Sequence, residues 1–330
     1  MECFVAYGTF KVVFTKTSQK LIFLKAFVVL SAIQAVIATG QFILQHPLGL
    51  NKLGEQLISP TQTGFAKIFI SGLAFVRGYG TFPHPNPLSA FLVTGILMAI
   101  YLFHQNQGKT ERVLYGTAIF LNIIGLTTTF SRAAILAAIS GIIVYFAFLL
   151  WQKQLIWPAK QALIIVFLSI FASLALFSPF LLARATISDS ASLERIFYAR
   201  VGLKIIENHP IIGIGAGESV LHMQQYSWIQ LQPWQIQPVH NYFLLAAAEL
   251  GIVGAAILCW IFLKHLLALV RRPHSQESFL LASIFISFLI LMQFDHYFYT
   301  LQQTQLLLWI ILGFMAAIKT PQIGEQNFSR

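Results

Sequence analysis

Long, uninterrupted apolar runs constrain this chain more than any other feature of its sequence. Each run has roughly 17–24 residues, the length that an α-helix needs to cross about 30 Å of hydrocarbon. The runs are continuous and do not alternate with polar residues, which favours helices over the strands of a membrane barrel. We therefore predict about eight transmembrane helices, near residues 21–44, 87–104, 113–130, 133–151, 160–182, 242–264, 278–294 and 299–318.

The composition supports a membrane protein and excludes other classes. Of the 330 residues, 57% are hydrophobic and 10% are charged, whereas about a quarter of the residues in soluble domains are charged. The net charge of +10 could indicate nucleic acid, but Lys and Arg are scattered between apolar runs and form no basic stretch with aromatic residues. We expect no nucleic-acid partner. Cys3 and Cys259 are too far apart for a metal-ligand motif and are expected to be packing residues.

Basic residues in the short loops predict the topology. With a cytoplasmic N-terminus, most Lys and Arg fall in the short cytoplasmic loops. The first apolar run is too long for a cleaved signal peptide and should remain as an anchor. Two outer segments are long, about 45–86 and 183–241. The predicted fold is therefore all-α: a polytopic transmembrane bundle forming a single membrane domain over residues 1–330, with its polar chemistry on the non-cytoplasmic side.

The second outer segment contains the signature of an amphipathic helix. Apolar residues recur at helical spacing among charged ones over residues 192–208, which indicates a helix on the membrane surface. The sequence Asn208-His209-Pro210 should end it, and three glycines at alternate positions should form a flexible turn. This glycine pattern has no strand before it, so it does not predict a dinucleotide site, and no metal set or phosphate-binding loop is recognisable.

Arginines at the outer ends of the predicted helices are candidates for binding an anion. Arg132 lies between two spans with almost no loop, which indicates either a functional guanidinium or a residue that reaches to the interface. Arg195 and Arg200 are five residues apart, so on a helix they diverge by about 140° and only one need face a site. A planar guanidinium suits phosphate oxygens, and ordinary headgroup contact is the alternative.

A rigid loop precedes the second predicted span. It begins at Arg77, and three prolines surround His84 and Asn86. Prolines remove backbone freedom and backbone donors. The loop could therefore aim these side chains at a site, or it could only fix the start of the helix.

His240 and Asn241 lie at the outer start of the span near 242–264. An imidazole there can accept a proton from a hydroxyl, as a general base does, or it can be a polar cap. Glu249 is about two turns further and needs a partner or a proton, so we expect it to support the helix ends. Asp295 and His296 form another carboxylate and imidazole candidate, but as sequence neighbours they would not face each other on a helix.

These residues form four blocks in a fixed order over residues 77–251, and together they resemble the O-antigen ligase and O-antigen polymerase superfamily. The blocks are Arg77-Gly78 with residues 81–86, Phe130-Ser131-Arg132, residues 195–217 with their His-Pro and alternating glycines, and His240-Asn241 with Glu249 and Gly251.

The resemblance implies a glycosyltransferase that uses neither a metal nor another cofactor. It would move a glycan from an undecaprenyl diphosphate carrier to a hydroxyl of a lipid, polysaccharide or protein acceptor, outside the cytoplasmic (inner) membrane. Arg132, Arg195 and Arg200 would match the arginines that bind the donor diphosphate, and His240 would match the proposed base. The supporting or acceptor-binding residues would be Arg77, His84, Asn86, Asn241 and Glu249.

Two other classes compete with this interpretation. A transporter or flippase for a lipid-linked or anionic solute would also use outer arginines, although the sequence shows no repeated halves. An inactive, truncated membrane scaffold is the third possibility. It is suggested by the few spans before the first block, because family members commonly have more, and by residues 1–15, which resemble the end of a longer segment.

Overall fold

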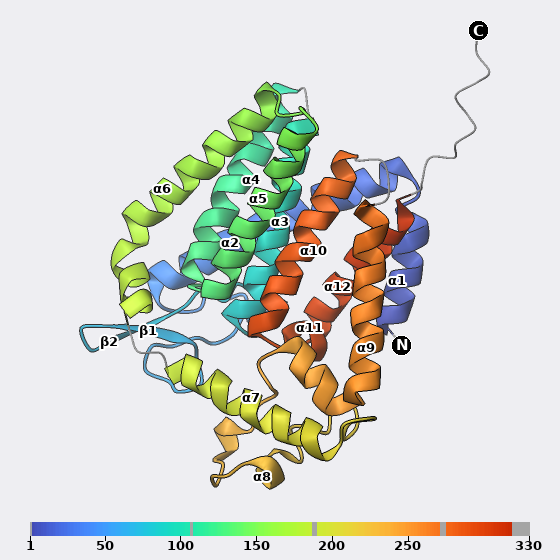
Figure 1. Ribbon diagram of the computed structural model, residues 1–330. Helices are drawn as coiled ribbons and strands as arrows, with labels where there is room; N and C mark the ends of the chain where they lie inside the picture. The colour runs from blue at the N-terminus through green and yellow to red at the C-terminus, as the bar shows by residue number, and fades with distance from the viewer. Residues whose placement is uncertain (1, 106–107, 187–189, 271–274, 319–330) are drawn as a thin grey trace, which may run out of the picture.

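The computed structural model describes residues 2–105, 108–186, 190–270 and 275–318, and in it long helices run side by side with loops gathered at one end (Figure 1). The elements are α1 (Glu2–Val13), α2 (Thr17–Leu44), η1 (Asn51–Leu53), β1 (Lys67–Ile70), β2 (Leu73–Val76), α3 (Pro85–Gln105), α4 (Lys109–Thr128), α5 (Arg132–Trp151), α6 (Trp157–Thr186), α7 (Ser190–Asn208), α8 (Met223–Tyr226), η2 (Pro233–Gln235), α9 (Tyr242–Val270), α10 (Gln276–Phe294), α11 (Tyr297–Thr300) and α12 (Gln302–Ala317).

The predicted all-α membrane bundle is confirmed. Helices lie at all eight predicted spans, and six of them, α2, α3, α5, α6, α9 and α10, are long and apolar enough to cross a membrane. The other two fall short for physical reasons. The first turn of α4 carries Lys109, Glu111 and Arg112, and α12 has 16 residues, fewer than the roughly 20 that a span needs. Both still pack within the bundle.

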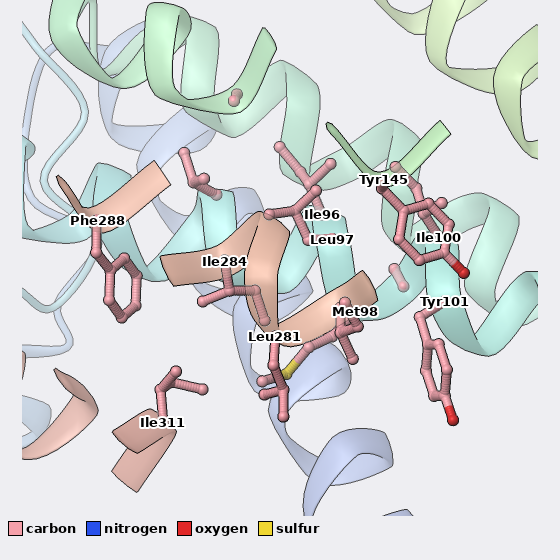
Figure 2. Close-up of a cluster of buried hydrophobic side chains, with 14 of the residues drawn as sticks. Ile96, Leu97, Met98, Ile100, Tyr101, Tyr145, Leu281, Ile284, Phe288 and Ile311 are labelled. Carbon is pink, nitrogen blue, oxygen red and sulfur yellow. The ribbon is translucent and has the colours of Figure 1, made fainter. Parts of the chain in front are cut away.

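The core of the bundle is built around α3. In its apolar stretch 94% of the residues are buried, compared with 22% in α6, which lies at the edge and keeps large apolar side chains on its outer surface. Figure 2 shows this core, in which side chains of α3 meet those of three other helices. The labelled residues are Ile96, Leu97, Met98, Ile100, Tyr101, Tyr145, Leu281, Ile284, Phe288 and Ile311.

Small residues let the first helices approach closely. A Cβ atom on Gly125 of α4 would lie 2.6 Å from the Cα atom of Ala35 in α2, and one on Gly95 of α3 would lie 2.2 Å from Oγ of Ser31. Contacts this short leave no room for a side chain. Helix pairs in membranes rely on such close backbone packing, because lipid tails are as apolar as the side chains and the hydrophobic effect does not bring the helices together.

Two elements were not anticipated from the sequence. β1 and β2 form an antiparallel hairpin in which Lys67 pairs with Val76, and α1 packs along α12, with the rings of Phe14 and Phe314 4.4 Å apart. The sequence of residues 2–13 mixes polar and apolar positions, so its helix depends on contacts with a segment about 300 residues away, which no local pattern reveals.

The predicted amphipathic helix is α7, but its apolar side is not simply laid on the membrane. Tyr198, Val201 and Ile205 are buried in a small cluster with Met223 of α8 and Ala248 of α9. Other apolar residues of α7, such as Leu193, remain exposed. Residues 187–189 of the predicted outer segment lie outside the described residues.

The predicted span near 242–264 is broken. Gly251 has φ 69° and ψ 178°, a backbone conformation that is not helical and is essentially restricted to glycine. A short helical segment from 242 to 250 therefore precedes the long part of α9 (Figure 1). Glu249 belongs to the short segment and does not lie two turns inside a continuous span.

Adding one methyl group at Gly125 tests the close packing of α2 and α4. Gly125→Ala should force the two helices apart and lower the free energy of unfolding by about 1–3 kcal/mol. The midpoint of thermal unfolding in detergent, followed by tryptophan fluorescence, measures the effect. The control is Gly8→Ala in α1, where a Cβ atom would meet nothing within 4 Å. Equal midpoints for the two variants would contradict the packing described.

Candidate functional site

The candidate residues gather at one end of the bundle. Helices α2, α4 and α10 end there, and α3, α5 and α9 begin there, together with the hairpin, α7 and α8 (Figure 1). Arg132 opens α5, and His240 and Asn241 directly precede α9. The guanidinium and imidazole groups singled out in the sequence therefore share one side of the molecule.

A buried chain of polar side chains links the first block to the end of α10. Arg77 donates from Nε to the carbonyl oxygen of Thr129 and from a terminal nitrogen to Oδ1 of Asn86, 2.9 Å away. Asn86 donates in turn from Nδ2 to Oδ2 of Asp295 at 2.7 Å. One amide thus connects a guanidinium to a carboxylate, and the loop, α3 and α10 are held in register.

The guanidinium of Arg77 and the carboxylate of Asp295 both stay ionised. Burial and the neighbouring guanidinium groups lower the pKa of Arg77 to about 9, which leaves it cationic at neutral pH. Burial acts to raise the pKa of Asp295, but the imidazoles of His296, His240 and His84 outweigh it, so the pKa lies below its usual value. The carboxylate is therefore a fixed negative charge beneath the histidines.

His84 accepts a hydrogen bond at the start of α3. The backbone N–H of Asn86 donates to Nδ1 of His84 at 3.1 Å, so the proton of the neutral ring is on Nε2. Burial and the charge of Arg77 lower the pKa of His84 to about 3. The proline-rich loop therefore does more than begin a helix, because it fixes a neutral imidazole and the Asn86 amide beside Asp295.

His240 is oriented by two aromatic neighbours. Tyr198 of α7 stacks on its ring with centroids 5.1 Å apart and planes 21° apart, and His296 meets it edge-on at 5.0 Å. Burial lowers the pKa of His240, while Asp295 acts to raise it. Its Nδ1 atom is buried and makes no hydrogen bond within the described part of the chain.

Asp295 and His296 do interact, contrary to what a helix would allow. The helix α10 ends at Phe294, and Asp295 is extended, so the backbone N–H of His296 donates to Oδ1 of Asp295 at 2.8 Å. Nδ1 of His296 lies 2.7 Å from the hydroxyl of Thr300. Nε2 of His296 lies 3.9 Å from Oδ1 of Asp295. The expectation that the two side chains would not face each other was wrong, because both residues follow the end of α10 and do not lie within it.

An open groove of about 680 Å³ passes beside His240. Its polar side chains are Arg195, His240, Asn241 and Gln293, and its other side chains are apolar. The apolar residues come from α7, from the first segment of α9 and from the end of α10: Ile196, Ala199, Leu203, Phe243, Leu244, Ala247 and Phe294. The groove can therefore accept a molecule with one apolar and one anionic part.

The structure separates the two arginines of α7. Arg195 lines the groove and donates from Nε to the carbonyl oxygen of Phe294 at 3.2 Å, whereas Arg200 is exposed and is not among the lining residues. Arg184, near the end of α6, lies within electrostatic range of Arg132 and Arg195. It was missed in the sequence, although its place at the outer end of a predicted span is a usable signal.

Arg132 owes its place to a tight turn. Phe130 adopts φ 46° and is buried, with its ring 5.0 Å from that of Phe42, so α5 begins two residues later. Ser287 of α10 donates to the carbonyl oxygen of Ala137 at 2.8 Å. Because α5 and α10 run in opposite directions, Arg132 lies near the level at which α10 ends.

Glu249 and Asn241 anchor the surrounding loops. The carboxylate of Glu249 is buried and accepts hydrogen bonds from the Gly217 N–H at 2.7 Å and from the Ser219 hydroxyl at 2.6 Å. Asn241 accepts from the Leu244 N–H and donates to the carbonyl oxygen of Gln293, which ties the start of α9 to α10. Both residues therefore hold loops and helix ends around the groove.

Residues 210–217, which contain the alternating glycines, cross α9 at the break beside Gly251. Ile252 donates its N–H to the carbonyl oxygen of Pro210, and Gly215 donates to that of Glu249. A Cβ atom on Gly213 would lie 2.4 Å from the Glu249 carbonyl, and one on Gly251 would lie 2.0 Å from the Ile211 oxygen. The glycines are therefore required for the crossing, and the turn is not a flexible one.

No group of three His, Cys, Asp or Glu side chains in the described ranges has the arrangement of a metal site. The histidines around Asp295 make ring contacts and hydrogen bonds instead.

Comparison with known families identifies the region that carries most of these residues. Residues 117–259 match the family model described as O-antigen ligase. This part of the chain is therefore similar to the O-antigen ligase family. The matched region includes Arg132, Arg195, His240 and Glu249, while the loop from Arg77 to Asn86 precedes it. No curated protein matches the chain.

The match confirms the resemblance noted in the sequence. The long apolar helices indicate a multi-pass membrane protein, and the match over residues 117–259 supports a family of glycan transferases. The geometry adds a reason for the order of the blocks within the matched region. The glycine block and Glu249 hold α7 against α9, and this contact forms the groove that contains Arg195 and His240.

Replacing Glu249 should loosen this contact. Glu249→Gln removes the negative charge that receives two hydrogen bonds, and such bonds to charged groups contribute about 1.5–3 kcal/mol. We expect faster amide hydrogen exchange over residues 210–219 and α7. The matched control is Glu207→Gln, an exposed carboxylate on α7, which should leave exchange unchanged. Unchanged exchange in Glu249→Gln would show that the carboxylate does not hold the loop.

Proposed function

We propose that the protein transfers a glycan from an undecaprenyl diphosphate carrier to a hydroxyl group of an acceptor on the non-cytoplasmic side of the cytoplasmic membrane. The observation that carries the proposal is the groove beside α7, in which apolar side chains continue into Arg195 and His240. A polyprenyl diphosphate has the same two parts, an apolar chain and an anionic head. The match of residues 117–259 to the O-antigen ligase family model supports this substrate class.

In the proposed reaction His240 is the general base. Its lowered pKa keeps the imidazole neutral near pH 7, so the ring can take the proton of the acceptor hydroxyl. The acceptor oxygen then bonds to the anomeric carbon as the bond from that carbon to the diphosphate oxygen breaks. The proton is on His240, and undecaprenyl diphosphate leaves with its electron pair.

The arginines would stabilise the leaving group. Arg195 bonds through Nε to Phe294, and a guanidinium has five donors, so its terminal nitrogens can reach diphosphate oxygens. Arg132 and Arg184 add positive charge nearby. Charge that grows on the departing diphosphate is then offset by groups already in position. Arg200 would contact lipid headgroups.

Charge removal at two positions of one helix tests the donor site. We expect Arg195→Gln to lower kcat/KM for glycan transfer from the undecaprenyl diphosphate donor by about 100-fold or more. Arg200→Gln on the same helix is the matched control and should stay within about threefold of wild type. The measurement is the rate of transfer by purified protein in nanodiscs. Similar losses in both variants would argue against a groove-specific role for Arg195.

Replacing His240 tests the proposed proton transfer. His240→Ala should reduce kcat by about 100-fold to 10,000-fold while donor binding in nanodiscs persists. A transporter would instead move the lipid-linked glycan across a bilayer without forming the acceptor bond. Full transfer activity in His240→Ala would remove this residue from the mechanism.

The pH profile tests the charge around the base. Catalysis needs the neutral ring, so the rate falls as the pH drops through the pKa of His240, which burial lowers from 6.5. The acid limb should therefore lie below pH 6.5. Asp295 acts to raise this pKa, so Asp295→Asn should move the limb to still lower pH and reduce kcat.

The control for this shift is Glu218→Gln, whose carboxylate lies 3.3 Å from His222 and does not act on His240. Its acid limb should coincide with that of wild type. An acid limb that moves to higher pH in Asp295→Asn would contradict the proposed electrostatics.

A further inference from the structure

The segment from α8 to His240 has an unusual surface. Residues 223–239 contain no charged side chain but include six glutamines. Trp234 is 71% exposed and Trp228 is 50% exposed. Large aromatic side chains exposed on a polar, uncharged surface call for an explanation, because exposed apolar patches usually mark binding sites.

Local hydrogen bonds make this surface a defined one. Gln224 donates to the carbonyl oxygen of Ile229 and accepts from the N–H of Leu231. Gln237 donates to the carbonyl oxygen of Trp234 at 2.8 Å. Some glutamines are thus used to fold the segment, including its backbone at Trp234.

Buried contacts attach the segment to α7. Met223 and Leu231 belong to the small cluster with Val201, and the ring of Trp228 lies 4.9 Å from that of Phe197. Trp228 therefore has one neighbour that fixes it and an open side.

Other glutamines are free to bind. Gln225 and Gln230 are exposed, and their side chains make no hydrogen bond to any residue that the structure describes. An amide offers two donors and an acceptor at once, which matches the hydroxyl groups of a sugar. An indole offers a flat apolar surface, which matches the C–H side of a pyranose ring.

The segment is connected to the proposed base. The hydroxyl of Tyr198 donates to the carbonyl oxygen of Gln235 at 2.8 Å, and the Tyr198 ring stacks on His240. Trp234 is the direct sequence neighbour of Gln235. A molecule bound over Trp234 therefore lies close along the chain to the groove in which transfer is proposed.

The alternative is that the tryptophans anchor the protein in the membrane interface, where Trp and Tyr are common. Two observations oppose it. In Figure 1, α8 lies on the side of α7 away from the helical bundle. The segment also has no Lys or Arg to meet anionic headgroups.

We propose that residues 223–238, with Trp228 and Trp234 as stacking surfaces and Gln225 and Gln230 as hydrogen-bonding groups, form a binding platform for an uncharged stretch of glycan. The platform rests on the proposed function for its substrate class, and it holds sugars remote from the bond that is transferred. Binding energy from this remote part of the substrate is available to position the reacting end.

Direct binding tests the platform independently of catalysis. The probe is the oligosaccharide released by mild acid from the lipid-linked pool of the source cells, bound to the full-length protein in nanodiscs and measured by calorimetry. Trp234→Ala should weaken binding about fivefold, as expected for one aromatic contact, and Gln230→Ala should weaken it less. Trp260→Ala is the matched control, since Trp260 is 62% exposed on α9, and it should bind as wild type does.

Transfer kinetics give a second readout. Trp234→Ala should raise KM for a donor that carries the full glycan and leave KM unchanged for a donor that carries one sugar. If no transfer occurs but the released oligosaccharide binds and Trp234→Ala weakens that binding, the platform stands and the proposed function fails.

Two results would overturn the platform. The first is wild-type affinity for the oligosaccharide in both Trp228→Ala and Trp234→Ala. The second is strong quenching by brominated lipid in a variant whose tryptophans other than 228 and 234 are replaced by Phe, because this would place both indoles in the membrane interface.

Discussion

The buried series of hydrogen bonds from Arg77 through Asn86 to Asp295 sets the geometry of the end of the bundle that carries the polar groups. A carboxylate and a guanidinium removed from water are costly unless both are paired and hydrogen-bonded. Here one amide satisfies both, since Oδ1 of Asn86 accepts from Arg77 and its Nδ2 donates to Asp295. Any displacement of the proline-rich loop from the end of α10 would remove one hydrogen bond from each of two buried charges.

The same carboxylate connects structure to chemistry. It lies among three imidazoles, and its charge opposes the effect of burial on His240. A base that is too deeply buried would have a very low pKa and little affinity for a proton. Burial therefore keeps His240 neutral and Asp295 keeps it basic, which is the balance that the proposed proton acceptor needs near neutral pH.

The sequence was sufficient to predict the helices and the end of the bundle that carries the polar groups. Apolar run length depends only on the thickness of the bilayer, so α2, α3, α5, α6 and α10 could be located without tertiary information. Likewise, the order of the spans placed Arg132 and His240 at the same end of the bundle.

What the sequence could not provide is contact between distant segments. The break at Gly251 follows from the crossing of residues 210–215, and the helix α1 follows from packing on α12. Hydropathy detects neither the break nor α1, because a broken helix and a continuous one have the same composition. The choice between Arg195 and Arg200 also needed the structure, since helical periodicity separates them by angle but does not say which direction faces α9.

The surfaces around His240 explain why α7 lies across the end of the bundle. One side of α7 forms the groove with α9, where apolar residues lead to Arg195. Its other contacts hold the uncharged segment with Trp228 and Trp234. A lipid-linked glycan has its apolar chain, its diphosphate and its sugars in a fixed order. α7 borders all three kinds of surface, and Tyr198 joins two of them at His240. In the proposed reaction the helix would therefore align the anomeric carbon with His240.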